Sequence, residues 1–226
     1  MRFNVSMNNN SNTKVVKLNY HHGDLQQKLL DEATSMIEES GIEGLSLRKL
    51  ATRVGVSRTA PYHHFKDKND LLCAIAEHGY KSRIEKAKEL LNDDVLSVRE
   101  KFHLFVHDYV RFAYENQELY ELMFGRAIWK QNNSTQALRD VAYPCFQYQL
   151  EMTKSWQENG LIKSDENTLR LAQVIWGTVH GIAKLLIDGI YTQTSQVEEM
   201  CDSAVALFTN MASQDQSVLL NKKKPI

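Results

Sequence analysis

The fold is decided by the stretch Leu47-Arg-Lys-Leu-Ala-Thr-Arg-Val-Gly-Val-Ser-Arg-Thr-Ala-Pro-Tyr-His-His-Phe65. Its pattern predicts two short helices joined by Val54-Gly55-Val56-Ser57. A tight turn between helices needs a residue that adopts positive φ, and Gly55 supplies it. Leu50, Ala51 and Val56 are apolar where the two helices touch, and Ala51 is small enough to let them approach closely. The stretch therefore predicts a helix-turn-helix.

The second helix of this unit is expected to begin with Ser57 as its N-cap and to end near Phe65. Its outward positions carry hydrogen-bonding side chains suited to base edges or phosphates, namely Arg58, Thr59, Tyr62 and His63. Pro61 falls within the first turn or so, where few amides have intrahelical partners, so its cost should be modest. These features favour a DNA-binding function.

Helical periodicity extends in both directions from this unit. Asp24 is expected to cap a first helix that Gly41 ends, and Ser46 to cap the next. Asp67 or Lys68 opens a long fourth helix. Further helices are expected near residues 96–115, 117–129, 134–159, 165–190 and 195–212.

The sequence thus predicts an all-α protein of about nine helices, with Gly160 as a C-cap and Asp165 as an N-cap. The domains expected are a disordered arm at 1–18, a helix-turn-helix DNA-binding domain at 19–67, a helical ligand-binding and dimerisation domain at 68–213, and a polar tail at 214–226.

Composition agrees with a helical fold but gives weak support to DNA binding. The chain of 226 residues has only 10 Gly and 3 Pro, and its net charge is -1. The segment through residue 70 holds ten Lys or Arg against eight Asp or Glu, so it is only mildly basic. The motif, rather than the charge, has to carry the functional argument.

Cysteines and hydropathy point to a cytoplasmic protein without a membrane segment. Cys73, Cys145 and Cys201 are scattered and lack CxxC spacing, so we expect neither disulfides nor a zinc cluster. The N-terminus has no continuous apolar stretch of the kind that a signal peptide needs, so none is expected. The most apolar run, residues 171–190, contains four polar or charged side chains that are costly in a bilayer, so we expect a buried helix there.

Four pieces of the N-terminal region resemble the TetR family of bacterial regulators. They are Tyr20-His21-His22-Gly23-Asp24-Leu25, Gly41-Ile-Glu-Gly-Leu-Ser-Leu-Arg48, Val54-Gly55-Val56-Ser57 and Tyr62-His63-His64-Phe65-Lys66-Asp67-Lys68. Farther on, Trp176-Gly177 and His180-Gly181 resemble a Trp…His-Gly signature in one subset of the family's C-terminal domains. Pro61 departs from the family, which usually has an aliphatic residue there.

The resemblance implies DNA contacts for nine residues: Ser46 and Arg48 to phosphates, Ser57, Arg58 and Thr59 to the major groove, Tyr62 and His63 to phosphate or bases, and Lys66 and Lys68 to the backbone. A lysine beside a helix N-terminus reinforces a phosphate site, because the free amides there already attract anions.

Four other features of this region admit a second interpretation. Phe65 is expected to be core, and His64 to be structural rather than a base reader. Arg53 is either a DNA contact or a solvated residue. Residues 20–22 either touch phosphate or merely begin the fold.

The C-terminal two-thirds has aromatic inner faces that either pack a core or line a cavity for a small apolar or aromatic ligand. Tyr109, Tyr143, Trp156 and His180 are the expected polar anchors. The candidate pocket consists of Phe105, Tyr109, Phe112, Met123, Phe124, Tyr143, Phe146, Trp156, Trp176 and His180.

The last two long helices are the expected homodimer surface. One face is predicted to be Val174, Gly177, Thr178, Gly181, Ile182 and Leu185, and the other Val197, Met200, Cys201, Ala204, Val205 and Phe208. A two-fold dimer would read a palindromic operator, with recognition helices about 34–36 Å apart. We expect a ligand-responsive repressor, with an activator or a ligand-independent regulator of the same fold as the alternative.

Two other classes of protein are the alternatives to a DNA-binding regulator. The chain has no GxSxG, P-loop, GxGxxG or HExxH motif, so we expect no enzyme, no catalytic residues and no cofactor. His103 and His107 would share a helix face and could bind a metal with a third ligand, but a lone pair of this kind is usually incidental, so no metal site is expected. A helical binding protein with a vestigial helix-turn-helix is the other alternative.

Overall fold

The structure is a computed structural model that describes residues 22–130, 133–191 and 195–221. The predicted arm at 1–18 lies outside these residues. The described chain is all-α, as predicted. Its helices are α1 (His22–Gly44), α2 (Leu47–Val54), the short 3-10 helix η1 (Ala60–His63), α3 (Lys68–Leu91), α4 (Val98–Glu115), α5 (Gln117–Phe124), α6 (Arg126–Trp129), α7 (Gln136–Glu158), α8 (Thr168–Ile187) and α9 (Ser195–Asn221).

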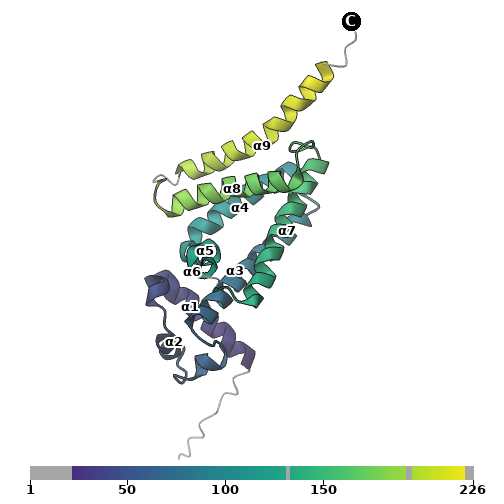
Figure 1. The fold of residues 1–226 in the computed structure, drawn as a ribbon. Coiled ribbons are helices and arrows are strands. Elements are labelled where there is room, and N and C mark those ends of the chain that lie inside the picture. Colours follow the sequence, from purple (N-terminus) through teal and green to yellow (C-terminus); the bar gives the residue numbers. More distant parts are fainter. Residues whose placement is uncertain (1–21, 131–132, 192–194, 222–226) are drawn as a thin grey trace, which may run out of the picture.

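The lower end of the molecule in Figure 1 is formed by α1, α2, η1 and the start of α3. Its apolar side chains form one core, in which Leu29, Leu50 and Leu71 have no exposed surface and Phe65 is 2% exposed. Phe65 is therefore core, as predicted. Leu122 and Met123 of α5 belong to the same core, so the small N-terminal unit is packed onto the rest of the chain.

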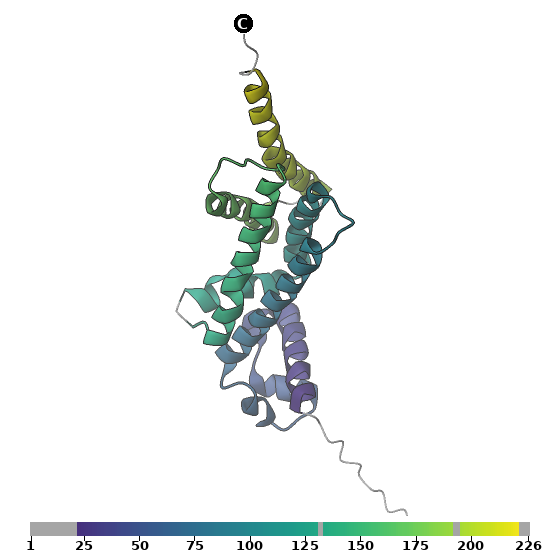
Figure 2. The same ribbon diagram turned by 90° about the vertical axis from the view of Figure 1, so that its right-hand side faces the viewer.

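The upper part is a set of long helices (Figures 1 and 2). Helix α3 rises from the lower end and packs along α7, while α4 packs against α8 and α9. A second core fills this part, with Phe102, Val106, Ile175 and Val179 fully buried. Helix α9 packs on α4 and α8, and its C-terminal part extends past the other helices. Within the described ranges, no helix is long and apolar enough to cross a membrane.

Several helix ends differ from the predictions. Helix α1 begins at His22, so Asp24 lies inside it rather than capping it. Gly41 does break α1, with φ 68°, before a short turn ending at Gly44. The predicted helix 117–129 is divided at Gly125, whose extended backbone separates α5 from α6.

The ends of the later helices also need correction. Gly160 follows α7 with φ 68°, as a C-terminal glycine should. The N-cap of α8 is Asn167, which accepts from the Arg170 amide, and not Asp165. Helix α9 continues to Asn221 instead of ending at 212, because residues 195–221 contain no Gly or Pro that would stop it.

Candidate DNA-binding surface and ligand cavity

The turn between α2 and η1 has the geometry that the sequence predicts. The Ser46 hydroxyl accepts a hydrogen bond from the Lys49 amide at 3.2 Å and so caps α2. Gly55 ends α2 with φ 75°, in the left-handed region that favours glycine. The Val56 amide donates to the Ala51 carbonyl at 2.9 Å, and Ala51 itself is completely buried. The two elements are therefore held at a defined angle.

The second element of the motif is shorter than predicted. Ser57 does not cap an α-helix, because its hydroxyl faces that of Thr59 at 3.2 Å and the helix that follows is the four-residue η1. Pro61 explains the difference. It has no amide to donate, and the bonds of Ala60 to Ser57 and of Tyr62 to Thr59 span three residues instead of four. The second element of the motif is thus shortened at Pro61, and Arg58 lies in the turn before η1.

The nine predicted DNA-contact residues all lie on α2 and its N-cap, the turn, η1, or the first residues of α3 and the loop before it. This is the end of the molecule at the bottom of Figure 1. Seven of the nine are exposed, and Ser46 and Lys68 are half-buried. Among the described residues, the guanidinium groups of Arg48 and Arg58 make no hydrogen bond or ion pair. They are therefore available to a partner.

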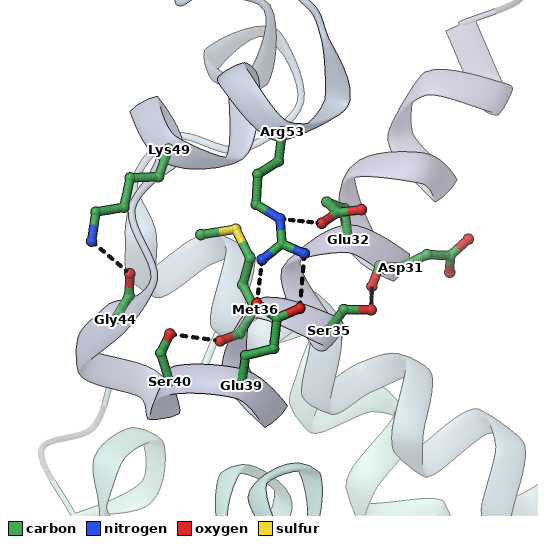
Figure 3. Close-up of polar contacts among 9 residues, drawn as sticks. All are labelled: Asp31, Glu32, Ser35, Met36, Glu39, Ser40, Gly44, Lys49 and Arg53. Atoms are coloured by element: carbon green, nitrogen blue, oxygen red, sulfur yellow. Dashed lines mark hydrogen bonds and ion pairs between the residues drawn. The ribbon is translucent and has the colours of Figure 1, made fainter.

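Arg53 has a structural role that the sequence left open. Its Nε lies 2.5 Å from Glu32 Oε1, and its two terminal nitrogens lie 2.5 and 2.9 Å from the Glu39 carboxylate (Figure 3). The hydrogen bond from Arg53 holds the pKa of the Glu39 carboxyl below its usual range. Arg53 therefore clamps α2 onto α1. The spacing of seven residues, which places Glu32 and Glu39 on one helix face, was the signal for this clamp.

The start of α3 is defined by a reciprocal pair of caps. The Asp67 carboxylate accepts from the Asp70 amide, and the Asp70 carboxylate accepts from the Lys66 amide, both at 2.9 Å. Asp67 is thus the N-cap and Lys68 the first helical residue, as predicted. The two flanking lysines therefore stand beside the positive end of a 24-residue helix.

An apolar cavity of about 120 Å³ lies in the upper part of the molecule. For comparison, a protein cavity of about 150 Å³ binds benzene. The cavity takes its walls from α3, α4, α5, α7 and α8. Six of the ten predicted pocket residues line it: Phe105, Tyr109, Phe112, Phe124, Phe146 and Trp176. The sequence therefore located most of the aromatic wall.

Two more predicted pocket residues line a neighbouring hollow. Met123 and Tyr143 lie there, and this hollow shares Tyr80, Phe124, Ala142, Phe146 and Trp176 with the first cavity. Tyr143 is 64% exposed, so it stands at the mouth rather than in the interior.

Trp156 and His180 line neither cavity, contrary to the prediction. Trp156 is buried in the second core, with its ring centroid 4.7 Å from that of Phe102. His180 Nδ1 is bonded to the Tyr120 hydroxyl and lies 3.3 Å from that of Tyr109. Nδ1 of His180 therefore faces two tyrosine hydroxyl groups and not the open space.

A buried polar network stands behind the cavity wall. Trp176 donates through Nε1 to the Tyr109 hydroxyl at 2.9 Å, which also lies 3.1 Å from that of Tyr120. Burial raises the pKa of Tyr109 to about 12. Burial, with the charge of Lys184 as a second cause, lowers the pKa of His180. The network therefore consists of neutral groups that join α4, α5 and α8.

The charged residues that line the cavity, Arg83, Lys86 and Asp108, were not predicted from the sequence. Arg83 pairs with Asp108 at 2.6 Å, and its guanidinium lies 4.9 Å from the centre of the Phe112 ring. Burial opposes ionisation of Asp108, but Arg83 and Arg111 outweigh it and hold the pKa of this carboxyl below its usual range. The spacing of Tyr80, Arg83, Ala87 and Leu90 on one face of α3 was the available signal.

One of the two predicted dimer faces is wrong. The α9 face with Cys201, Ala204 and Val205 is buried against α4 and α8 of the same chain. The hydrophobic stripe of α9 packs into the core of its own chain. Periodicity alone cannot distinguish a face that packs within the chain from one that forms a dimer interface. The predicted face of α8 is accessible to a partner, because Val174 is 56% and Leu185 37% exposed.

An outward polar helix-turn-helix at one end and an apolar cavity in a separate helical layer define a DNA-binding regulator with a place for a small molecule. The chain belongs to the TetR family. Residues 29–75 match the family "Bacterial regulatory proteins, tetR family", and residues 102–208 match "Tetracyclin repressor-like, C-terminal domain".

Similar proteins agree with this membership. The regulator AcrR of Shigella flexneri is 26% identical over 164 residues, which are 70% of this chain and 76% of AcrR. A Rhodococcus sp. RHA1 protein of unknown function is 31% identical, with a TM-score of 0.74 over 86% of this chain and 98% of its own. The fold of Bacillus subtilis FadR, solved with stearoyl-CoA, is similar at 18% identity, with a TM-score of 0.62 over 82% of this chain and 98% of its own.

Proposed function

We propose that this protein is a ligand-responsive repressor that binds a palindromic operator as a homodimer and leaves it when an apolar ligand enters the cavity. The observation that carries the proposal is the course of α3. This helix begins at Lys68 beside the DNA-binding surface, and Arg83, fifteen residues later, lines the cavity. That separation is about 22 Å along the helix axis. A displacement of α3 at the cavity would therefore also move the residues at the DNA-binding surface.

On the DNA side, Arg58 and Thr59 read bases, since they are exposed at the turn that opens η1. Arg48 and the lysines Lys66 and Lys68 hold phosphates, together with Ser46. Tyr62 and His63, both exposed, together with Ser57, complete the surface. Arg53 is excluded because two carboxylates already occupy its guanidinium.

On the ligand side, the cavity fits an apolar or aromatic molecule with one polar end. Its walls are mostly aromatic, and the Arg83–Asp108 pair supplies one charged group of each sign. The FadR relative holds an acyl-CoA, a ligand with this same division into apolar and polar parts. Because the present space is smaller than a cavity of about 150 Å³ that binds benzene, a larger ligand has to push α3 and α7 apart. That movement is the proposed signal.

For the dimer, α8 supplies the central surface and the outer face of α9 the rest. Regulators of this family act as dimers. Val174 and Leu185 are exposed on α8, and Leu207 on α9 is 67% exposed. A Cβ added at Gly177 or Gly181 would meet none of the described atoms within 4 Å, so a partner helix has room to approach closely.

The experiment is a fluorescence-anisotropy titration of an operator recovered by selection from random duplexes, with fatty acids, acyl-CoA thioesters and planar aromatics added in turn. A ligand of the right class should weaken DNA binding by about 5–150-fold. Phe146→Ala, in the cavity wall, should reduce this response and leave ligand-free DNA affinity intact. Tyr114→Ala, on the exposed side of α4, is the matched control. A ligand that binds without changing DNA affinity, or a response that Phe146→Ala leaves unaltered, contradicts the mechanism.

A further inference from the structure

Three metal-ligating side chains meet on the surface of the protein, and none of them lines the ligand cavity. His103 and His107 lie one turn apart on α4, and Asp202 reaches them from α9. The two imidazole Nε2 atoms lie 3.0 and 2.9 Å from the same carboxylate oxygen of Asp202. The sequence shows the histidine pair, and folding adds the third group, 95 residues away from His107.

We propose that His103, His107 and Asp202 form a binding site for a divalent transition-metal ion such as zinc. Bonds from zinc to nitrogen are about 2.0–2.1 Å and those to carboxylate oxygen about 2.0–2.2 Å, so the ligand atoms of a tetrahedral site are about 3.4 Å apart. The three ligand atoms here lie within 4.8 Å of one another, and the two nitrogen–oxygen distances are within about half an ångström of that spacing. Small side-chain rotations are enough to admit the ion.

The donor atoms select the class of metal. Two imidazole nitrogens and one carboxylate suit zinc, nickel, copper or cobalt, whereas magnesium and calcium require mainly oxygen ligands. A hollow lined by His107, Glu198 and Cys201 opens beside the site, which leaves room for water as a further ligand. Three protein ligands and one open position make a complete coordination sphere.

The site is separate from the ligand cavity. Around the axis of α4, positions 103 and 107 are about 120–160° from positions 105 and 109, whose side chains line the cavity. The metal would join α4 to α9, and α9 packs on α4 and α8. Metal binding would therefore stabilise the attachment of a helix that the proposed dimer uses, and this inference goes beyond the proposed function without resting on it.

The test uses the full chain, freed of metal with a chelator and titrated calorimetrically with zinc chloride. The wild type should show a saturable site that magnesium chloride does not fill. His107→Gln and Asp202→Asn should each weaken this site at least tenfold, since even loss of an outer-shell partner costs about 10–100-fold in metal affinity. His78→Gln, an exposed histidine on α3, is the control and should titrate like the wild type.

A second measurement keeps the outcome decisive if a variant folds poorly. Zinc should protect His103 and His107 of the wild type from modification by diethyl pyrocarbonate, read by mass spectrometry, while His78 stays reactive. Equal zinc affinity in the wild type and both folded variants, or unprotected His103 and His107, would overturn the proposal. The cluster would then be only a carboxylate that accepts two imidazole hydrogen bonds.

Discussion

Replacing Lys68 by alanine tests the phosphate-binding end of α3. Lys68 is the first residue of this helix, directly after the Asp67 cap. Its side chain is half-buried. The amides of the helix start remain when its side chain is removed, so the variant loses one charged contact per protomer and keeps the fold. The effect should therefore appear in the salt dependence of DNA binding.

The expected magnitude follows from the number of phosphates released. Each phosphate contact on B-DNA contributes about −0.9 to the slope of log K against log salt, and a dimer carries two copies of Lys68, so the slope should become less steep by about 1.8. Between 50 and 200 mM salt this amounts to about tenfold: the wild type should lose about ten times more affinity than the variant.

The assay is fluorescence anisotropy on one operator and one unrelated duplex at four salt concentrations. Lys81→Ala is the matched control, because Lys81 lies on the same helix, pairs with Glu77 and is about 20 Å from Lys68, which is beyond the range of screened charge at these concentrations. It should leave the slope unchanged. An unchanged slope in Lys68→Ala, or an equal change in Lys81→Ala, refutes the assignment of Lys68 to the phosphate backbone.

Three further predictions concern stability and assembly. Gly55→Ala should lower the free energy of unfolding by about 1–2 kcal/mol in urea titrations, because φ at this residue is 75°; an unchanged midpoint would show that the turn relaxes. Val174→Glu should convert the dimer to monomer in sedimentation velocity, whereas Val95→Glu, at a 92% exposed loop position, should not. Stability should fall as pH decreases through about 6.5. Burial lowers the pKa of His180 in the folded protein, so this histidine takes up a proton at higher pH in the unfolded chain than in the folded one. His180→Asn should make the fall in stability less steep, and an equally steep fall would assign it to other groups.

Local features of the fold were predictable because their causes lie within a few residues. Ser46 caps α2 and Gly55 ends it with positive φ, and both features depend only on residues within the same short segment. The 3-10 form of η1 was not predicted, because Pro61 at the start of a helix is compatible with either a 3-10 or an α-helix.

Features that depend on contacts between distant helices were less predictable. The buried stripe of α9 looked like a dimer face, since periodicity shows that a face is apolar and not what covers it. The aromatic wall of the cavity was predicted from composition, but Arg83 was not, because its place there is set by Asp108 on another helix. In the same way, the contact of Asp202 with the histidine pair depends on the packing of α9 on α4, which the sequence does not show.

The claim that the turn and η1 read DNA sequence is tested most directly by selecting bound duplexes from a random pool with the wild type, Arg58→Ala and Thr59→Ala. The wild type should enrich an inverted repeat. Each variant should enrich the same repeat with one or more positions in each half-site degenerate, because a lost base contact removes about 1–3 kcal/mol of discrimination. Failure of the wild type to enrich a symmetric sequence, or identical stringency in both variants, would contradict the account.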